Sequence, residues 1–506
     1  MRDHQEPCID PVGRRRLGAT AGLVHHAHRM KSEIMSDQNK RSLQDLIDSV
    51  PSLVDYFYND TLAPHAASHP GLIPVPQEVT NWRDEQRAWR ESVLLFDQSH
   101  HMPETFIKGP DTTRLLSDVG INSFANFPPL RAKQYIGCNH NGELIGECIL
   151  QHLPDGTHNL ISGMNLQNWV EYNAKTGGYD VHIVRDLHTG ENRSGRTNYR
   201  YQLDGPLAEA VFEAVIEGEK PDIPFFRLAQ VRVAGCDVLA LRHSVAGHKG
   251  VELSGPYAEG PAVRAALLNA GRRHGILQAG MKTYFSAAAE VGWIGYPMPA
   301  IYTDPRLAGY RQWLPADSWE GRAQLGGSFR SQNIEDYYVT PWDHGLNKLI
   351  KFDHDFIGRE ALERKAAEGN HRSKVTLVWN DEDVTRVYAS LFGTEIPFKY
   401  MDLPRASYAF QQCDEVRNRN GEMVGLSKYL AYTVNEAKFL SVAVVNADHA
   451  EPGTEVLITW GEPDGGSRKP AVERHRQTTV RATVAPAPYA RTVQTMKNAP
   501  MVKEHA

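Results

Sequence analysis

The chain has 506 residues, 41% of them hydrophobic and 23% charged, which is enough for roughly two to four domains with buried cores. A formal net charge of -6 excludes the strongly basic surface that is typical of nucleic-acid-binding proteins. No apolar run reaches bilayer length, and the five scattered cysteines include no C-x-x-C pair, so we expect a cytoplasmic protein without a disulfide framework or zinc site.

Residues 1–34 contain a weak targeting signal. Arg14-Arg15-Arg16 and the short apolar run after them are similar to a twin-arginine export signal, but His25-His26 interrupts the run. No small-residue cleavage site follows, and both Met30 and Met35 are candidate starts. We therefore interpret residues 1–34 as a disordered arm or a mis-set start.

The next segments predict a mixed helix and strand region over residues 35–372. Apolar spacing predicts a helix over 42–58, and the proline-rich stretch 64–76 predicts an irregular segment. Further helices are expected from Ser117 onward, over 207–217 and over 260–274. Strands are expected at 104–109, 134–139, 144–153, 158–164 and 179–187. Because strands and helices do not alternate regularly, the pattern favours an α+β fold of two interleaved subdomains over a doubly wound sheet.

The character of the chain changes near residue 373. Strand-like runs at 374–380, 422–434, 439–446, 454–461 and 478–486 are separated by Gly, Asp and Pro, and Asn420-Gly421 predicts a hairpin turn. This pattern indicates a small all-β barrel over 373–490, followed by a disordered tail over 491–506.

Several common catalytic motifs are absent from the sequence. It contains no G-x-G-x-x-G after a strand, no phosphate-binding loop and no G-x-S-x-G elbow. The residues around His354 do not match the D-x-H-x-x-G motif of corrinoid proteins. His100-His101 with His243 and His248 is the best metal candidate, but neighbouring strand residues point to opposite faces, so we expect no metal site.

Three stretches resemble the aminomethyltransferase (glycine cleavage T-protein) family. "IKFDHDFIGREAL" at 350–362 is close to the family signature, "GVELSGPY" at 250–257 corresponds to a family strand, and "AEVGWIGY" at 289–296 retains a Glu-x-Gly. The resemblance covers most of 81–362. It implies folate-binding α+β plaits followed by a C-terminal β-barrel.

Longer stretches resemble the tetrahydrofolate-dependent O-demethylases of vanillate- and syringate-type lignin fragments. They are "NWRDEQRAWRESVLLFDQSHHM", "AKQYIG", "GGSFRSQNIEDYYV", "FDHDFIGREAL" and "YASLFGTE". The resemblance implies transfer of a methyl group from a methoxylated aromatic acid to tetrahydrofolate, giving 5-methyltetrahydrofolate and a phenol or catechol. Because phenolate is a modest leaving group, this reaction needs an in-line acceptor nitrogen and a proton donor to the departing oxygen.

The resemblance also implies a set of site residues. Tyr257 aligns with a tyrosine acid and Glu252 with a glutamate that pairs with the pterin, whereas the alternative is that Tyr257 only packs beside Pro256. We expect Tyr257 and His101 to be catalytic. The expected folate contacts are Glu252, Gln98, Tyr135, Glu147 and Trp293. The expected substrate contacts are His100, His248, Lys249 and Tyr296.

One departure from this pattern concerns the substrate. Vanillate demethylases carry tyrosines and an arginine at places where this chain has Pro70-Gly71-Leu72 and Gly163-Met164. An arginine that forks onto a carboxylate is not readily replaced. We therefore expect either a syringate-like acid held elsewhere, by Lys249 or His248, or a methoxyarene that lacks the acid.

Two alternatives remain open on the sequence. One keeps the folate but takes its carbon from an aminomethyl lipoyl group or a dimethylated sulfonium acid. The other is a non-catalytic folate-binding regulator, whose Lys-Gly-Cys-Tyr signature is not found here. An unusually reactive cysteine would favour the regulator, because the demethylase needs none.

Overall fold

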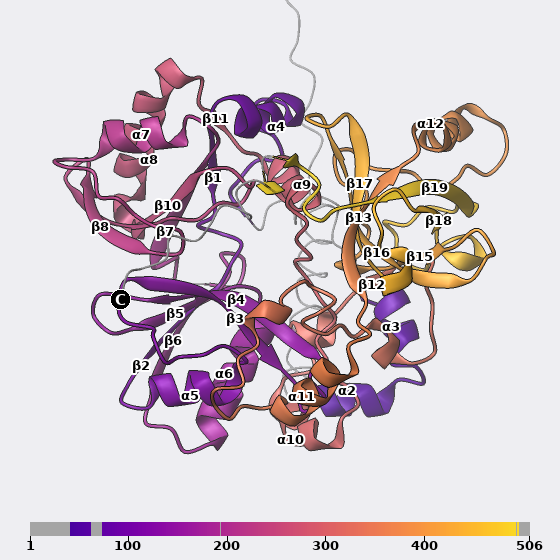
Figure 1. The fold of residues 1–506 in the computed structure, drawn as a ribbon, viewed down its shortest axis with the longest axis horizontal. Coiled ribbons are helices and arrows are strands. Elements are labelled where there is room, and N and C mark those ends of the chain that lie inside the picture. The colour runs from indigo at the N-terminus through magenta and orange to yellow at the C-terminus, as the bar shows by residue number, and fades with distance from the viewer. Residues whose placement is uncertain (1–40, 62–72, 193, 492, 495–506) are drawn as a thin grey trace, which may run out of the picture.

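The computed structural model describes residues 41–61, 73–192, 194–491 and 493–494 (Figure 1). The predictions for residues 1–34, for most of the proline-rich segment and for most of the C-terminal tail lie outside these ranges. Within them the chain builds a five-stranded sheet, a six-stranded sheet and a closed barrel, and helix α9 lies between the six-stranded sheet and the barrel.

The first helical segment is two helices where the sequence predicted one. Helix α2 spans Leu43–Ser49 and helix α3 spans Leu53–Asn59. Pro51 separates them, because proline lacks an N–H and disfavours helix at the residue before it. Ser52 then caps α3 by accepting a hydrogen bond from the backbone N–H of Asp55 at 3.2 Å.

The five-stranded sheet has the order β3-β4-β5-β2-β6. Its strands are β2 (Glu104–Lys108), β3 (Arg131–Cys138), β4 (Leu144–His152), β5 (His158–Ile161) and β6 (His182–Asp186). One face is covered by α5 (Thr112–Val119) and α6 (Met164–Thr176), which bury Leu115, Leu116 and Trp169. The helix predicted from Ser117 onward is therefore wrong, since α5 begins at Thr112 and ends at Val119, where Gly120 is extended.

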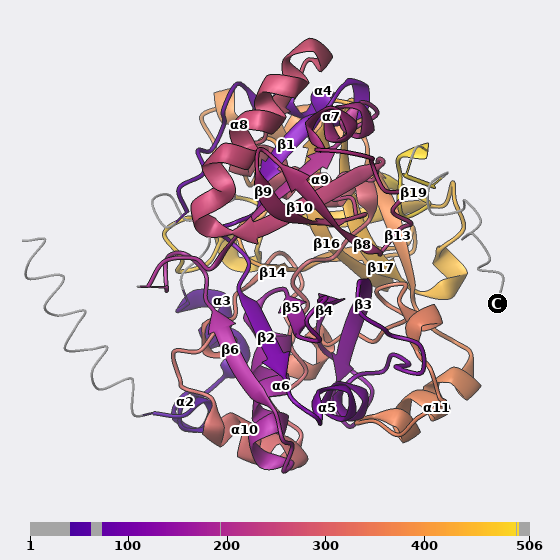
Figure 2. The same ribbon diagram turned by 90° about the vertical axis from the view of Figure 1, so that its left-hand side faces the viewer.

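The six-stranded sheet has the order β11-β1-β7-β10-β9-β8. Its strands are β1 (Leu94–Asp97), β7 (Asn198–Asp204), β8 (Leu228–Val233), β9 (Cys236–Leu241), β10 (Gly250–Pro256) and β11 (Leu277–Gln278). Helices α7 (Ala208–Val215) and α8 (Gly260–Gly271) cover its outer face (Figure 2). The chain places β1 in this sheet, builds the whole five-stranded sheet, and returns at β7.

The remaining helices connect these units. Helix α4 (Trp82–Glu91) precedes β1 and packs on α9 (Met281–Val291). Helices α10 (Ala308–Trp313) and α11 (Arg359–Glu368) and the short pair β12 (Leu325–Gly326) and β14 (Gln411–Gln412) lie in the connection towards the barrel. Helix α9 also contacts β16 and β17 of the barrel, so it lies where the six-stranded sheet and the barrel meet.

The C-terminal region closes into a six-stranded barrel of order β13-β17-β16-β15-β18-β19. Its strands are β13 (Ser373–Trp379), β15 (Asp414–Arg417), β16 (Met423–Thr433), β17 (Lys438–Val445), β18 (Glu455–Trp460) and β19 (Thr478–Ala485), with α12 at Asp381–Ala389. The Asn420-Gly421 turn joins β15 to β16, and Gly421 has the predicted positive φ of 84°. The α+β fold with a C-terminal barrel is confirmed. None of the helices in the described ranges has the length and apolar character needed to cross a membrane.

Candidate active site

A row of buried polar side chains crosses three neighbouring strands of the six-stranded sheet. Strand β7 alternates, and its tyrosines face α7 and α8 while its polar residues face the opposite way. The register pairs Gln202 of β7 with Phe96 of β1 and with Glu252 of β10. This polar row consists of Gln98, Arg200, Gln202 and Glu252, each at most 1% exposed.

An ion pair lies at the centre of the polar row. Arg200 donates from Nη2 to Glu252 Oε2 at 2.6 Å and from Nε to Oε1 at 3.2 Å. Burial lowers the pKa of Arg200, but the carboxylates of Glu252 and Glu104 more than offset this and raise it above its usual value. Arg200 therefore stays charged, and the two hydrogen bonds to Glu252 fix the guanidinium plane.

Other polar atoms of this face have no protein partner. Among the described residues, Gln98 Nε2, Arg200 Nη1, Gln202 Oε1 and His243 Nδ1 are buried without a hydrogen bond. Leaving such a group unsatisfied costs about 1–3 kcal/mol, and native proteins bury few of them. The donors and acceptors together fit a flat ligand with both kinds of group on one edge, such as the amino-pyrimidine edge of a pterin. The residues present therefore fit a folate.

His101 and Tyr284 form a hydrogen-bonded pair at the edge of the polar row. His101 Nε2 lies 2.9 Å from the Tyr284 hydroxyl, and the two rings are 4.6 Å apart between centroids. Burial and then the charge of Arg200 hold the pKa of His101 well below its usual value. Burial and then the neighbouring Tyr296 raise the pKa of Tyr284. At neutral pH the imidazole is uncharged and the phenol keeps its proton.

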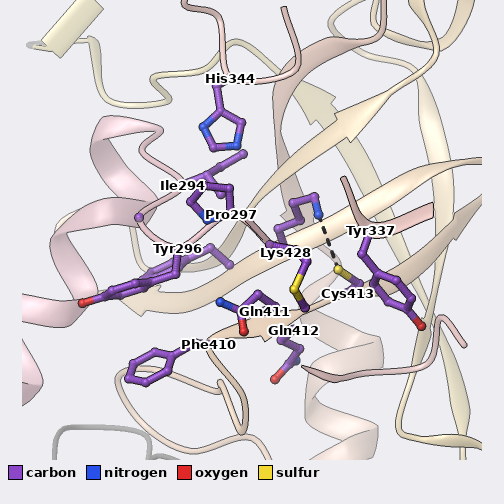
Figure 3. Close-up of a pocket in the computed structure, with 13 residues that line it drawn as sticks. Ile294, Tyr296, Pro297, Tyr337, His344, Phe410, Gln411, Gln412, Cys413 and Lys428 are labelled. Atoms are coloured by element: carbon purple, nitrogen blue, oxygen red, sulfur yellow. Dashed lines mark hydrogen bonds between the residues drawn. The ribbon is translucent and has the colours of Figure 1, made fainter. Parts of the chain in front are cut away.

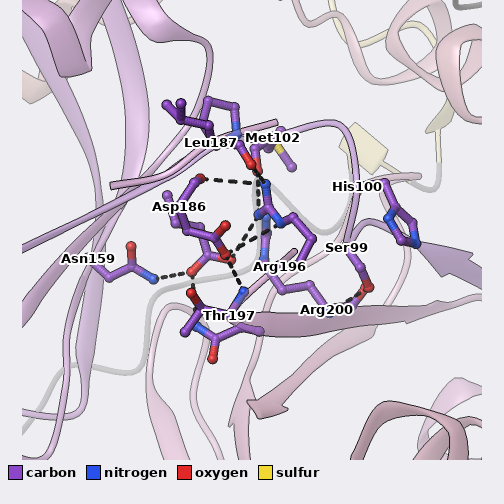
Figure 4. A network of polar contacts seen from close by, with 12 residues as sticks. Ser99, His100, Met102, Asn159, Asp186, Leu187, Arg196, Thr197 and Arg200 are labelled. Atoms are coloured by element: carbon purple, nitrogen blue, oxygen red, sulfur yellow. Dashed lines mark hydrogen bonds and ion pairs between the residues drawn. The ribbon is translucent and has the colours of Figure 1, made fainter. Parts of the chain in front are cut away.

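A second polar network fixes the segment that carries these histidines. Arg196 donates from Nη2 to the carbonyl of Met102 at 2.9 Å and lies 3.4 Å from Asp186 Oδ2 (Figure 4). Ser99 accepts from the backbone N–H of Arg200 at 3.0 Å. Residues 99–102 are thus held between the two sheets, and the position of His101 is set by the fold.

Aromatic side chains form a wall beyond Tyr284. The ring of Tyr296 lies 4.7 Å from that of Phe410, which lies 5.3 Å from Trp319. Figure 3 shows Tyr296 and Phe410 at one side of a pocket whose other side carries Lys428 and Cys413. Burial raises the pKa of Tyr296 to about 12, so this ring is neutral. A flat apolar ring would fit against such a wall.

Comparison with known proteins identifies the fold and its relatives. Residues 56–299 match the GCVT N-terminal domain. The chain is 42% identical to a syringate O-demethylase of Sphingobium sp., over 90% of this chain and 97% of that protein. It is 30% identical to a sesamin methylene transferase of Sinomonas sp., over 82% of this chain and 90% of that protein. The chain belongs to the GCVT aminomethyltransferase family.

A solved structure shows the same fold. The glycine cleavage system aminomethyltransferase T from Bartonella henselae matches with a TM-score of 0.57 at 15% identity, over 85% of this chain and 95% of that chain. The resemblance predicted from the sequence motifs is thus confirmed at the level of family and fold.

Four residues expected in the family site lie near one another. Gln98 and Glu252 belong to the polar row, and His101 contacts Tyr284 beside it. Tyr296 belongs to the aromatic wall and is close enough to Tyr284 to raise the pKa of its phenol. The structure therefore links the expected folate side and the expected substrate side through Tyr284.

Glu147 of β4 and Trp293, which follows α9, form a separate contact. Trp293 donates from Nε1 to Glu147 Oε1 at 2.7 Å, and Gln134 donates to the other carboxylate oxygen. Burial raises the pKa of Glu147. Trp293 is 42% exposed, so the pair lies at a surface open to a ligand. Their assignment to the folate stays a prediction.

Tyr135 has a structural role and does not line the site. Its hydroxyl donates to the carbonyl of Leu116 at 2.9 Å, and its ring is buried in the core beneath α5 and α6. Successive strand residues point to opposite faces, and Gln134 and Ile136, not Tyr135, share the face of Glu147. The predicted cofactor contact is corrected for this reason.

Tyr257 lies outside the polar row. It begins a short 3-10 helix after β10, is 41% exposed, and its ring is 6.0 Å from His100. Its hydroxyl bonds to no other described residue. Because β10 ends at Pro256, Tyr257 is not part of the strand face that carries Glu252. His100 is buried and bonds to Thr189 at 3.0 Å, so this pair forms the outer edge of the site.

His248 and Lys249 do not join the substrate side. They precede β10, at the end of the strand opposite Tyr257. Lys249 is exposed, and burial lowers the pKa of His248 to about 4. Neither makes a hydrogen bond to another predicted site residue in the part of the chain described. Across these ranges, no three His, Cys, Asp or Glu side chains gather into a metal site.

Arg200, Gln202 and Tyr284 were missed by the sequence reasoning. The signal for the first two is the alternation in "YRYQLD", where apolar residues at every second position predict a strand with a polar face. A polar strand face is usually exposed to solvent. It becomes a buried site only where other elements pack over it. For Tyr284 no local signal exists, because its partner His101 is 183 residues away.

Proposed function

We propose that this chain is a tetrahydrofolate-dependent O-demethylase that moves a methyl group from a methoxylated aromatic acid of the syringate or vanillate type to tetrahydrofolate. The products are 5-methyltetrahydrofolate and a phenol or catechol. Support comes from the 42% identity to a syringate O-demethylase over nearly the full length of both chains. The observation that carries the mechanism is the His101–Tyr284 pair between the polar row and the aromatic wall.

The polar row would hold the pterin of the folate. Arg200 Nη1 and Gln98 Nε2 are available as donors, and Gln202 Oε1 is available as an acceptor. The carboxylate of Glu252 has lone pairs left after binding Arg200 and would accept from pterin N–H groups. Tetrahydrofolate, when bound, supplies the nucleophilic ring nitrogen that takes the methyl group and releases a proton.

Tyr284 acts as the acid in this proposal. As the bond between methyl carbon and aryl oxygen breaks, the electron pair stays on the oxygen, which takes the proton of the Tyr284 phenol. The raised pKa keeps Tyr284 protonated until negative charge develops on the aryl oxygen, which then takes the proton. His101 is a positioning residue, because its neutral ring contacts the Tyr284 hydroxyl and orients it.

The surroundings favour an aryl ether over the alternative donors. Arg405 lies over the rings of Phe285 and Tyr429 beside the aromatic wall, and its positive charge opposes a sulfonium or ammonium substrate. Burial raises the pKa of the thiols of Cys138, Cys148 and Cys413, so none of them has the reactive thiolate that a cysteine-based regulator needs. The scattered, unpaired cysteines are also the basis for proposing a cytoplasmic location.

Two matched tyrosine variants test the assignment of the acid. Tyr284→Phe should lower kcat by about 100- to 10,000-fold, the range for loss of a general acid, with little change in substrate affinity. Tyr257→Phe should change kcat by no more than about twofold, because that side chain is exposed and away from the chemistry. Both are measured as demethylated product formed from methoxybenzoates with tetrahydrofolate under anaerobic conditions. The opposite ranking of the two variants would restore Tyr257 as the acid.

A further inference from the structure

Arg405 is a buried arginine that the reaction described above does not use. It lies in the barrel region, where residue 405 forms a bridge with Ala431 of β16, and it is only 5% exposed. Its guanidinium lies 4.7 Å from the ring centroid of Tyr429 and 5.3 Å from that of Phe285. The guanidinium thus contacts one aromatic ring from the barrel and one from α9.

Among the described residues, no anion balances the charge of Arg405. Its guanidinium donates from Nη2 to the hydroxyl of Ser407 at 3.3 Å, and Nε is buried without a partner in the described ranges. No described Asp or Glu forms an ion pair with it, whereas the other buried arginine of the site, Arg200, is paired with Glu252. An unpaired buried charge is strongly unfavourable, and contact with aromatic rings repays only part of that cost. Such a group is therefore poised to receive an anion.

Arg405 lies beside the residues that surround the proposed acid, Tyr284. Phe285 directly follows Tyr284, and its ring lies 6.3 Å from that of His101. Arg405 also lowers the pKa of Tyr296, which burial raises. Because Phe285 lies beside the guanidinium and directly follows Tyr284, Arg405 is next to the segment of α9 that carries the proposed acid.

We propose that Arg405 binds the carboxylate of the methoxylated aromatic acid, with two N–H groups of its guanidinium forked onto the two carboxylate oxygens. This inference rests on the proposed function and adds to it the substrate class that the site selects. It supplies from the barrel the anchor that is missing at Gly163-Met164. A guanidinium suits this role because its planar donors match a carboxylate in geometry as well as in charge.

Two other cations near the pocket are poorer candidates. Lys249 precedes β10 and is exposed, so it lies outside the aromatic wall. Lys428 lies in the pocket of Figure 3, where its ammonium donates to Cys413 Sγ at 3.4 Å, on the side of the pocket opposite Tyr296. Neither is stacked between the aromatic rings next to Tyr284.

Direct binding tests the proposal without requiring turnover. Calorimetric titration in the absence of tetrahydrofolate compares 4-hydroxy-3,5-dimethoxybenzoate with 2,6-dimethoxyphenol, the same ring without its carboxylate. The wild-type protein should bind the acid more tightly. Arg405→Met should weaken binding of the acid by about 10- to 100-fold, the range for a hydrogen bond to a charged group, and leave binding of the phenol unchanged. Arg405→Lys should recover only part of the loss, because lysine keeps the charge without the fork.

Two controls separate recognition from folding. Lys428→Met should leave the ratio of acid to phenol affinity unchanged. Arg405→Met should keep or raise the Tm of the ligand-free protein, because it removes an unbalanced buried charge, whereas a structural arginine would lower it. Equal affinity of the wild type for acid and phenol, or an acid preference that survives in Arg405→Met or is lost in Lys428→Met, would overturn the proposal. An acid that binds through Arg405 but transfers no methyl group would instead overturn the proposed function.

Discussion

The Arg200–Glu252 pair gives the site its charge pattern at the scale of single residues. Glu252 balances the charge of Arg200, so the polar row holds a guanidinium in a fixed position and the pair adds no net charge. Around the pair, burial keeps the histidines neutral, as the lowered pKa values of His101 and His243 show. Neutral rings with fixed hydrogen-bonding directions suit recognition of an uncharged heterocycle. Burial has the same effect on His158, away from the site, where it should make the unfolding free energy depend on pH.

His158 should make the protein less stable in acid. Burial lowers its pKa from 6.5 to about 4. The folded state therefore binds fewer protons than the unfolded state between these values. The contribution is complete above pH 6.5 and is lost as the pH falls towards 4. His158→Phe should keep the ring packing against His152 and reduce the dependence of the unfolding free energy on pH by up to about 1.4 kcal/mol per unit in this window.

Denaturant unfolding at several pH values measures this slope in both proteins. An unchanged slope in His158→Phe would show that His158 titrates normally in the folded chain. His182→Phe is the matched control, since His182 is an exposed histidine of the same sheet and should leave the slope as it is.

At the scale of elements, local patterns predicted much of the scaffold but not the site. The barrel strands and the Asn420-Gly421 turn follow from short-range alternation and turn chemistry. The polar row does not follow from such patterns, because the sequence of a strand such as β7 is typical of a half-exposed strand. Only the packing of other elements over its second face buries that face. The motif resemblance indicates Tyr257, which lies beyond the end of β10, and no motif indicates Tyr284. The site depends on contacts between residues far apart in sequence, which no local pattern encodes.

Helix α9 should depend on Glu290 for its attachment to its neighbours. The carboxylate of Glu290 is 1% exposed and accepts from Trp89 at 3.2 Å, Arg90 at 2.9 Å and Asn435 at 3.1 Å. These donors come from α4 and from the turn between β16 and β17. Glu290→Leu removes the acceptor and should lower the unfolding free energy by about 3–5 kcal/mol, as for breaking a buried ion pair.

Glu436 offers a matched control, because it pairs with the same arginine as Glu290. Arg90 also pairs with Glu436 at 2.8 Å, and that carboxylate is partly exposed. Glu436→Gln should cost about 1 kcal/mol or less, because exposed pairs contribute little. Both values come from denaturant unfolding followed by fluorescence. Equal effects of the two substitutions would show that α9 is not held through Glu290.

At the scale of the whole molecule, each unit supplies a different part of the proposed site. The six-stranded sheet provides the polar row, α9 provides Tyr284, and the barrel region provides Arg405 and Phe410. The division of the chain near residue 372 stays a prediction, and under this proposal neither part alone would contain a complete site. This arrangement agrees with the length of the match to the syringate O-demethylase, which covers 97% of that protein.

The central claim is the direct transfer of a methyl group from an aryl ether to folate. The most direct test incubates the full chain anaerobically with tetrahydrofolate and 4-hydroxy-3,5-dimethoxybenzoate carrying ¹³C in its methoxy groups, and follows both products by mass spectrometry. We predict labelled 5-methyltetrahydrofolate and demethylated acid in equal amounts, with no product when either reactant is omitted. Demethylated acid without label in the folate, or no turnover of any methoxybenzoate despite folate binding, would contradict the account.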